Sequence, residues 1–213
     1  MTENNGSRVQ DKLRLAGEVV SHLLNVPILS GAMVTFIFFR LPTDVPNRAS
    51  GFGLTLAFLC LIPLASLLFY IPGGVRDWAR IVRRQRIASF VLMIVSYPIG
   101  YVLLRVTEAP TIYEAIAVTY TLVTLGLIVF NLILRYKASG HAAGVAGPVA
   151  ALIYLYGLVA APLLALIPLV TWARVQSKAH DLWQNLVGAG LSLSITVLVL
   201  WLYGFPPLMG VVP

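Results

Sequence analysis

Residues 141–174 read HAAGVAGPVAALIYLYGLVAAPLLALIPLVTWAR, and this apolar block of 34 residues decides the fold. A single helix of that length would run for about 50 Å, well beyond the hydrocarbon core of a bilayer. Gly157 and Pro162 stand near the middle of the block, where a turn would fall. We therefore expect two short helices here, with both ends of the block on the same side of a membrane.

The whole chain has the composition of an integral membrane protein. Of its 213 residues, 59% are hydrophobic and 11% are charged, and the mean hydropathy is +0.88. Residues 1–16 form a polar N-terminal segment, and residues 17–213 are expected to be a single transmembrane domain. Its other apolar blocks lie at about 17–40, 52–71, 87–107, 112–135 and 181–203. These lengths predict an all-α, polytopic bundle of six to seven spans, with any active site at one membrane interface.

The basic residues predict an orientation. Seven crossings would place the N-terminus and the loops near 72–86, 136–141 and 174–181 on one side. That side would hold twelve of the fifteen Lys and Arg residues, against Arg40, Arg48 and Arg105 on the other. By the positive-inside rule, the basic side is expected to face the cytoplasm. We expect the protein to remain in the membrane and to have no nucleic-acid partner.

The loop and helix start at residues 173–190, ARVQSKAHDLWQNLVGAG, carry a first candidate site. If a helix begins near His180, Gln184 lies one turn further on and can hydrogen-bond one imidazole nitrogen. The other nitrogen is then free to attack phosphorus, and Arg174 can bind a phosphate in a bidentate fork. Asp181 and Gln184 also fit a capping box, so a purely capping role is the alternative, and both roles can coexist.

A second helix start, KASGHAAGVAG at residues 137–147, repeats the combination of a histidine and a nearby cation. Ser139 is a good N-cap, and Gly140 lets the backbone approach a ligand closely. The alternative is a capped helix that packs through its small residues. Because a helix start attracts anions, we expect Lys137, Ser139 and Gly140 to bind phosphate, with His141 beside them.

A basic segment at residues 73–90, GGVRDWARIVRRQRIASF, is the third candidate for phosphate binding. Such a run is typical of a positive-inside anchor. Together with the two histidine motifs it also predicts a phosphate clamp, in which Arg76 with Arg83 or Arg84 neutralises charge that develops in a transition state.

From about residue 72 to 190 these motifs resemble the type 2 phosphatidic acid phosphatases, whose three motifs are K-x6-R-P, P-S-G-H and S-R-x5-H-x3-D. Ser139, Gly140 and His141 match the second motif, with Ala138 in place of proline. Arg174 and His180 match the third with the same five-residue gap, and Ala173 replaces its serine. The resemblance implies that His180 is a nucleophile forming a phosphohistidine, that His141 is a general acid, and that Arg174 binds phosphate.

The chain departs from the family pattern at two places. Gln184 stands where the family usually has Asp, as in relatives resembling dolichyl diphosphatases, and a neutral partner stabilises an imidazolium less. In the first motif, Arg76 and Arg83 have the right spacing with Arg for Lys, Asp77 and Arg84 match only at the second residue, and no proline follows.

These observations lead to an expected function. We expect an integral-membrane phosphatase that hydrolyses the phosphate monoester or diphosphate of a phosphatidate-like or isoprenoid lipid. No metal or cofactor is expected, because the three histidines are scattered and no carboxylates cluster on the basic side. A lipid phosphotransferase using the same site, and a non-catalytic protein that binds or moves lipid phosphates, are the alternatives.

Overall fold

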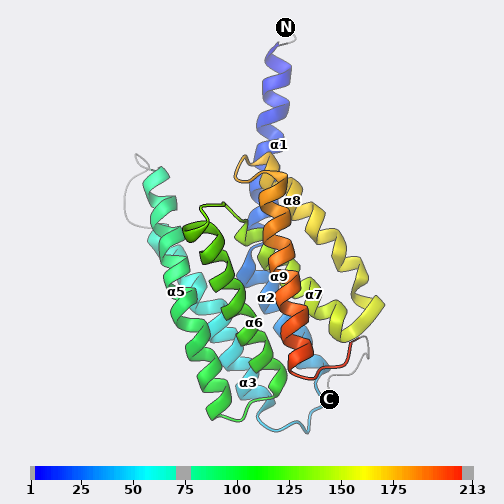
Figure 1. The fold of residues 1–213 in the computed structure, drawn as a ribbon. Coiled ribbons are helices and arrows are strands. Elements are labelled where there is room, and N and C mark those ends of the chain that lie inside the picture. Colours follow the sequence, from blue (N-terminus) through cyan, green and yellow to red (C-terminus); the bar gives the residue numbers. More distant parts are fainter. Residues whose placement is uncertain (1–2, 71–77, 208–213) are drawn as a thin grey trace. The chain divides into compact units, whose positions relative to one another are not determined.

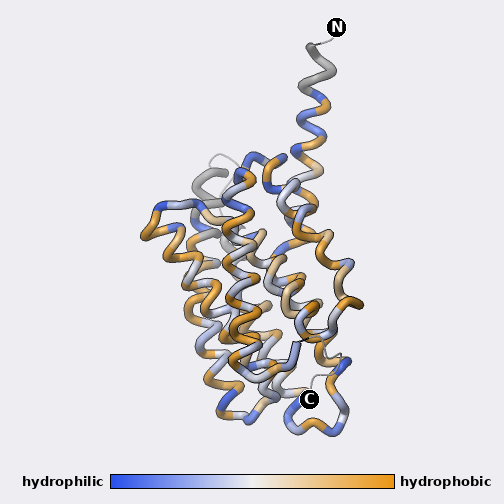
Figure 2. The backbone as a smooth tube through the Cα atoms, turned by 45° about the vertical axis from the view of Figure 1, so that its right-hand side comes forward, coloured by the Kyte–Doolittle hydropathy of each residue, from blue (hydrophilic) through white to orange (hydrophobic). Residues whose placement is uncertain are grey.

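The computed structural model describes residues 3–70 and 78–207, and all regular secondary structure in these ranges is helical. Four helical segments are long and apolar enough to cross a membrane, and each matches a predicted block within a few residues. They are Ile87–Val106, Thr111–Ile133, Gly140–Gln176 and Leu182–Leu202. Figure 2 shows apolar residues along most of the helices and polar residues gathered in the connecting loops. This is the pattern of a membrane protein, as the sequence predicted.

The apolar block at 141–174 folds as a hairpin of two helices. α7 (Gly140–Tyr156) ends at Gly157, whose φ of 69° and ψ of −149° are accessible to glycine and not to residues with a Cβ. A 3₁₀-helix, η5 (Gly157–Ala165), leads into α8 (Leu166–Gln176). Figure 1 shows the chain reversing between α7 and α8. The predicted turn at Gly157 is therefore confirmed.

The described residues form two compact units, and the first comprises the residues up to Leu29 and those from Gly126 onward. Small residues bring α7 and α9 (Leu182–Leu202) together in this unit. A Cβ built on Gly188 of α9 would overlap the carbonyl oxygen of Ser139, and one on Gly147 of α7 would lie 2.7 Å from Ser192 Oγ. The small-residue packing predicted for the GHAAGVAG run is thus present.

The N-terminal part of the chain differs from its prediction. α1 (Glu3–Leu23) starts within the segment predicted only to be polar, and α2 (Val26–Arg40) follows after a break. The predicted block at 17–40 is therefore two helices bent by 41° at the break, which together are long and apolar enough for one broken span. The break falls where Pro27, the second residue of α2, has no N–H to continue the hydrogen bonds of α1, and Asn25 Oδ1 accepts a hydrogen bond from Val26 N at 2.8 Å. α1 crosses the last turn of α8 at Gly17, where an added Cβ would lie 2.8 Å from Ala173 O.

The second unit comprises the residues from Ser30 to Leu125. Its remaining elements are α3 (Arg48–Leu56), the π-helix η1 (Ala57–Leu61), α4 (Ile62–Leu64), the 3₁₀-helix η2 (Ala65–Tyr70), α5 (Trp78–Val106) and most of α6 (Thr111–Ile128). The apolar helix over 48–64 is shorter than the four long segments. Hydrogen bonds join η2 to α5, since Ser89 Oγ lies 2.7 Å from Ser66 Oγ and accepts from Gln85 Nε2 at 2.9 Å.

Candidate active site

At the start of α9, the structure has both a capping box between Asp181 and Gln184 and a contact of Gln184 with His180. Asp181 Oδ1 accepts a hydrogen bond from Gln184 N at 2.8 Å, and Gln184 Oε1 accepts one from Asp181 N at 3.4 Å, which makes a capping box. The same Gln184 Oε1 lies 3.0 Å from His180 Nδ1. Gln184 therefore caps α9 and contacts the imidazole, so the predicted cap and the predicted imidazole contact are both confirmed.

Two oxygen atoms fix the tautomer of His180. In addition to Gln184 Oε1, the carbonyl oxygen of Lys137 lies 3.2 Å from His180 Nδ1. The N–H of Asp181 requires an acceptor, which assigns the facing atom of Gln184 as its oxygen. Because both neighbours of Nδ1 accept hydrogen bonds, Nδ1 carries the hydrogen. In the neutral imidazole the lone pair is then on Nε2.

The surroundings of His180 keep it uncharged. Burial lowers its pKa most, the positive charge of Arg174 lowers it further, and that of Lys137 contributes less. The hydrogen bonds to Gln184 and to the Lys137 carbonyl oppose these effects only in part, so the pKa is lowered from 6.5 to about 4. At neutral pH, Nε2 is therefore available to form a bond.

The start of α7 lies against the start of α9. Ser139 caps α7, because its Oγ accepts a hydrogen bond from Ala142 N at 3.3 Å, and its side chain is fully buried. Ser139 N donates to Gln184 O at 3.0 Å. His141 follows Gly140 in the first turn of α7 and is half-buried. The two histidine motifs, 39 residues apart in the sequence, thus meet at one end of this unit.

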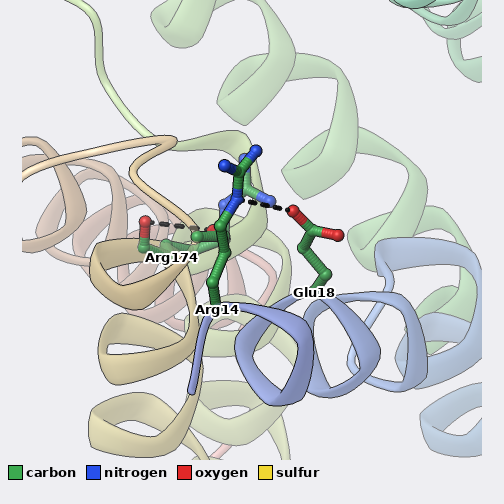
Figure 3. Close-up of polar contacts among 4 residues, drawn as sticks. Arg14, Glu18 and Arg174 are labelled. Carbon is green, nitrogen blue, oxygen red and sulfur yellow. Dashed lines mark hydrogen bonds and ion pairs between the residues drawn. The ribbon is translucent and has the colours of Figure 1, made fainter. Parts of the chain in front are cut away.

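Arg174 lies in the last turn of α8 and shapes the loop that carries His180. Its carbonyl oxygen accepts hydrogen bonds from Ala179 N at 3.1 Å and from His180 N at 3.2 Å, which closes the loop into a tight turn. Figure 3 shows Arg174 beside the ion pair of Arg14 and Glu18 on α1, which is 3.2 Å long. The predicted phosphate ligand lies six residues before the predicted nucleophile, and its positive charge acts on the His180 imidazole.

Lys137 contacts the same loop. Its ammonium Nζ donates to Ala179 O at 2.9 Å. Together with the bonds from His180 Nδ1 to Lys137 O and from Ser139 N to Gln184 O, this contact joins residues 137–139 to residues 179–184. The sequence predicted a phosphate ligand at Lys137, whereas in the structure this ammonium donates to a main-chain carbonyl.

Two asparagines that the sequence did not single out support the site. Asn185 on α9 is fully buried, and its Nδ2 donates to Asp181 O at 2.7 Å. Asn131 lies in the π-helix η4 (Val129–Ile133), and its Nδ2 contacts Leu127 O at 2.8 Å and Ala138 O at 3.3 Å. The available signal was an amide side chain within an otherwise apolar segment, which is costly in a membrane unless it is hydrogen-bonded.

The predicted arginine clamp is described only in part. Arg76 lies outside the described residues. For Arg83, in α5, only the backbone is described, and Arg84 on the same helix has an exposed side chain. Over residues 3–70 and 78–207, no group of three or more His, Cys, Asp or Glu side chains is placed to hold a metal ion.

Comparisons with protein-family models, with curated proteins and with solved structures found no match to this chain. The resemblance to the phosphatases therefore depends on the short motifs around His141 and His180 and on the geometry of their residues.

Proposed function

We propose that this chain is a membrane phosphatase that hydrolyses lipid phosphates through a phosphohistidine on His180, without a metal ion. The observation that carries the proposal is the state of the His180 imidazole. It is neutral, its Nδ1–H is held by Gln184 and Lys137, and its Nε2 has the free lone pair. An oriented, uncharged imidazole close to a guanidinium is well suited to nucleophilic attack on a phosphate.

In the first step, Nε2 of His180 attacks phosphorus, so that the P–N bond forms and the bond from phosphorus to the lipid oxygen breaks. Protonated His141 donates its proton to that oxygen, and the lipid leaves. In the second step, water attacks the phosphohistidine, His141 takes a proton from the water, and inorganic phosphate leaves. His180 is then neutral again, and its Nδ1–H has stayed in place throughout.

Arg174 and the start of α7 supply the phosphate-binding groups of this proposal. The guanidinium of Arg174 binds two phosphate oxygens in a fork, and the main-chain N–H groups after Ser139 and Gly140 face an anion at the helix start. Arg76, with Arg83 or Arg84, neutralises the remaining charge in the transition state. The loop at 177–181 is too short to recognise a large head group, which favours phosphatidate, an isoprenyl phosphate or an isoprenyl diphosphate as the substrate.

The proposed membrane arrangement has seven spans, the larger of the two numbers expected from the sequence. The broken pair α1 and α2, the helix over 48–64 with η2, α5, α6 and α9 each cross once, and the hairpin of α7 and α8 crosses twice. The active-site loops face the cytoplasm, since in this arrangement their side of the membrane carries twelve of the fifteen Lys and Arg residues. A protease-accessible tag at the N-terminus should be cleaved from the cytoplasmic side only.

Release of inorganic phosphate tests the function directly. Purified protein in nanodiscs, with a chelator present, should release phosphate from phosphatidate or from an isoprenyl mono- or diphosphate. His180→Ala should reduce the rate to background, whereas His22→Ala, at an exposed histidine of α1, should leave it unchanged. Full activity of His180→Ala would refute the proposed role. Transfer of the phosphate to an added alcohol would identify a transferase, and binding without turnover a lipid-phosphate binder.

A further inference from the structure

Lys137 contacts the His180 loop through its side chain and also through its main chain. The ammonium Nζ donates to Ala179 O at 2.9 Å, and the carbonyl oxygen of Lys137 accepts from His180 Nδ1 at 3.2 Å. The direction of that carbonyl is set by a tight turn, in which Ala138 N donates to Tyr136 O at 2.8 Å. Lys137 is thus linked to two successive residues of the loop, Ala179 and His180.

The main-chain oxygen of Lys137 complements the amide of Gln184. The Nδ1 of His180 lies 3.0 Å from Gln184 Oε1 and 3.2 Å from Lys137 O. Two neutral oxygens therefore accept the Nδ1–H, at a place where a single carboxylate could do so. Gln184 is fixed by the capping box of α9. The position of Lys137 O, by contrast, depends on how the loop at 136–139 lies against the loop at 177–181.

We infer that Lys137 is a positioning residue for His180: its ammonium holds the two loops together, and its carbonyl then keeps the imidazole in the Nδ1–H form with Nε2 free. The effect on catalysis rests on the proposed function, whereas the effect on the tautomer does not. Lys137 acts here through His180 and differs in this from the phosphate ligand that the sequence predicted.

Electrostatics add to the effect of the hydrogen bonds. The positive charge of Lys137 also lowers the pKa of His180, after burial and after Arg174. Lys178 lies two residues before His180 in the same loop and is not among the groups that shift this pKa. The other charged groups on the elements around this loop are Arg135 and Lys178 in the loops, Asp181 at the start of α9, and Arg14 and Glu18 on α1.

The chain therefore offers a matched pair of variants, Lys137→Met and Lys178→Met, which remove the same charge from neighbouring loop positions. We would label the full-length protein with ¹⁵N-histidine in nanodiscs and assign His180 from its absence in His180→Gln. The wild type and Lys178→Met should show one tautomer, protonated at Nδ1, with no titration between pH 5 and pH 8. Lys137→Met should show averaged nitrogen shifts and a higher pKa, and Lys137→Arg, which can still donate to Ala179 O, should restore the wild-type spectrum.

Kinetics distinguish positioning from phosphate binding. A positioning role predicts that Lys137→Met lowers kcat by about 10-fold to 100-fold with little change in KM, because misplacement of a reacting atom affects mainly the chemical step. Unchanged His141 and His22 signals would show that the variant is folded. An unchanged His180 spectrum in Lys137→Met, with or without a raised KM, would overturn the inference. If the wild type proved inactive on every lipid phosphate, the spectra alone would still decide it.

Discussion

Replacing Gln184 by Glu changes one atom of the site and places a carboxylate against His180. Gln184 Oε1 lies 3.0 Å from His180 Nδ1, so the shape is kept and the hydrogen bond becomes charge-assisted. Hydrogen bonds to charged groups contribute about 1.5–3 kcal/mol, against about 1 kcal/mol for neutral ones. Because about 1.4 kcal/mol corresponds to one pKa unit, the pKa of His180 should rise from about 4 by about one.

The same substitution should change the balance of the two chemical steps. A phosphohistidine that keeps its Nδ1–H is a cationic imidazole, so a carboxylate stabilises it by about 1 kcal/mol and slows its breakdown by about 5-fold to 10-fold. A larger fraction of the enzyme should then be trapped as acid-labile phosphoenzyme after rapid quenching. The fold should not suffer, since Glu at this position also suits a capping box.

The assay combines ¹⁵N-histidine titration with quench trapping of the phosphoenzyme. Gln10→Glu provides the control, because it makes the same chemical change at an exposed position of α1. A pKa of His180 that stayed the same or fell in the Glu variant would refute the proposed contact between residues 180 and 184. A raised pKa without any trapped phosphoenzyme would refute the phosphohistidine and leave the contact intact.

Three further predictions concern pH, packing and the hairpin. The pKa of His180 is lower in the folded than in the unfolded chain, so folding stability should fall as the pH drops from about 6.5 to about 4. Thermal unfolding followed by circular dichroism should show this dependence, and His180→Gln should flatten it. Gly188→Ala should destabilise the protein by about 1–3 kcal/mol, because the new Cβ would overlap the Ser139 carbonyl. Gly190→Ala is the control: a Cβ at Gly190 has no neighbour within 4 Å, so this variant should stabilise α9 by up to about 1 kcal/mol. Gly157→Ala should lower the melting temperature in the same assay, since a residue with a Cβ is strained at φ 69° by about 1–3 kcal/mol.

The long apolar segments could be predicted from the sequence because length and hydropathy alone define a span. The hairpin in residues 140–176 followed from the same reasoning, since a single rod would be too long and Gly157 offers a turn. The start of α1 was not predicted, because its first turns are polar and hydropathy gives no signal there. The break between α1 and α2 was not predicted either, although Pro27, which lacks an N–H, stands in the first turn of α2.

The candidate site was predictable where side chains four residues apart meet at a helix start, as His180 and Gln184 do, although α9 itself begins at Leu182. The second acceptor of His180 could not be predicted, since every residue has a main-chain carbonyl and only the tertiary placement of Lys137 selects this one. Asn185 was missed for a similar reason, because its bond to Asp181 O depends on the way the helix start is capped. Hydrogen bonds made by the main chain leave almost no trace in a single sequence.

The hairpin of α7 and α8 has a consequence for how the protein is made. The hydrogen bonds around His180 join residues that are at most 45 positions apart, and all of them lie between Leu127 and Asn185. None of these hydrogen bonds requires a residue before Leu127 or after Asn185. The groups around His180 can therefore assemble as soon as the start of α9 has been synthesised, together with the insertion of the hairpin.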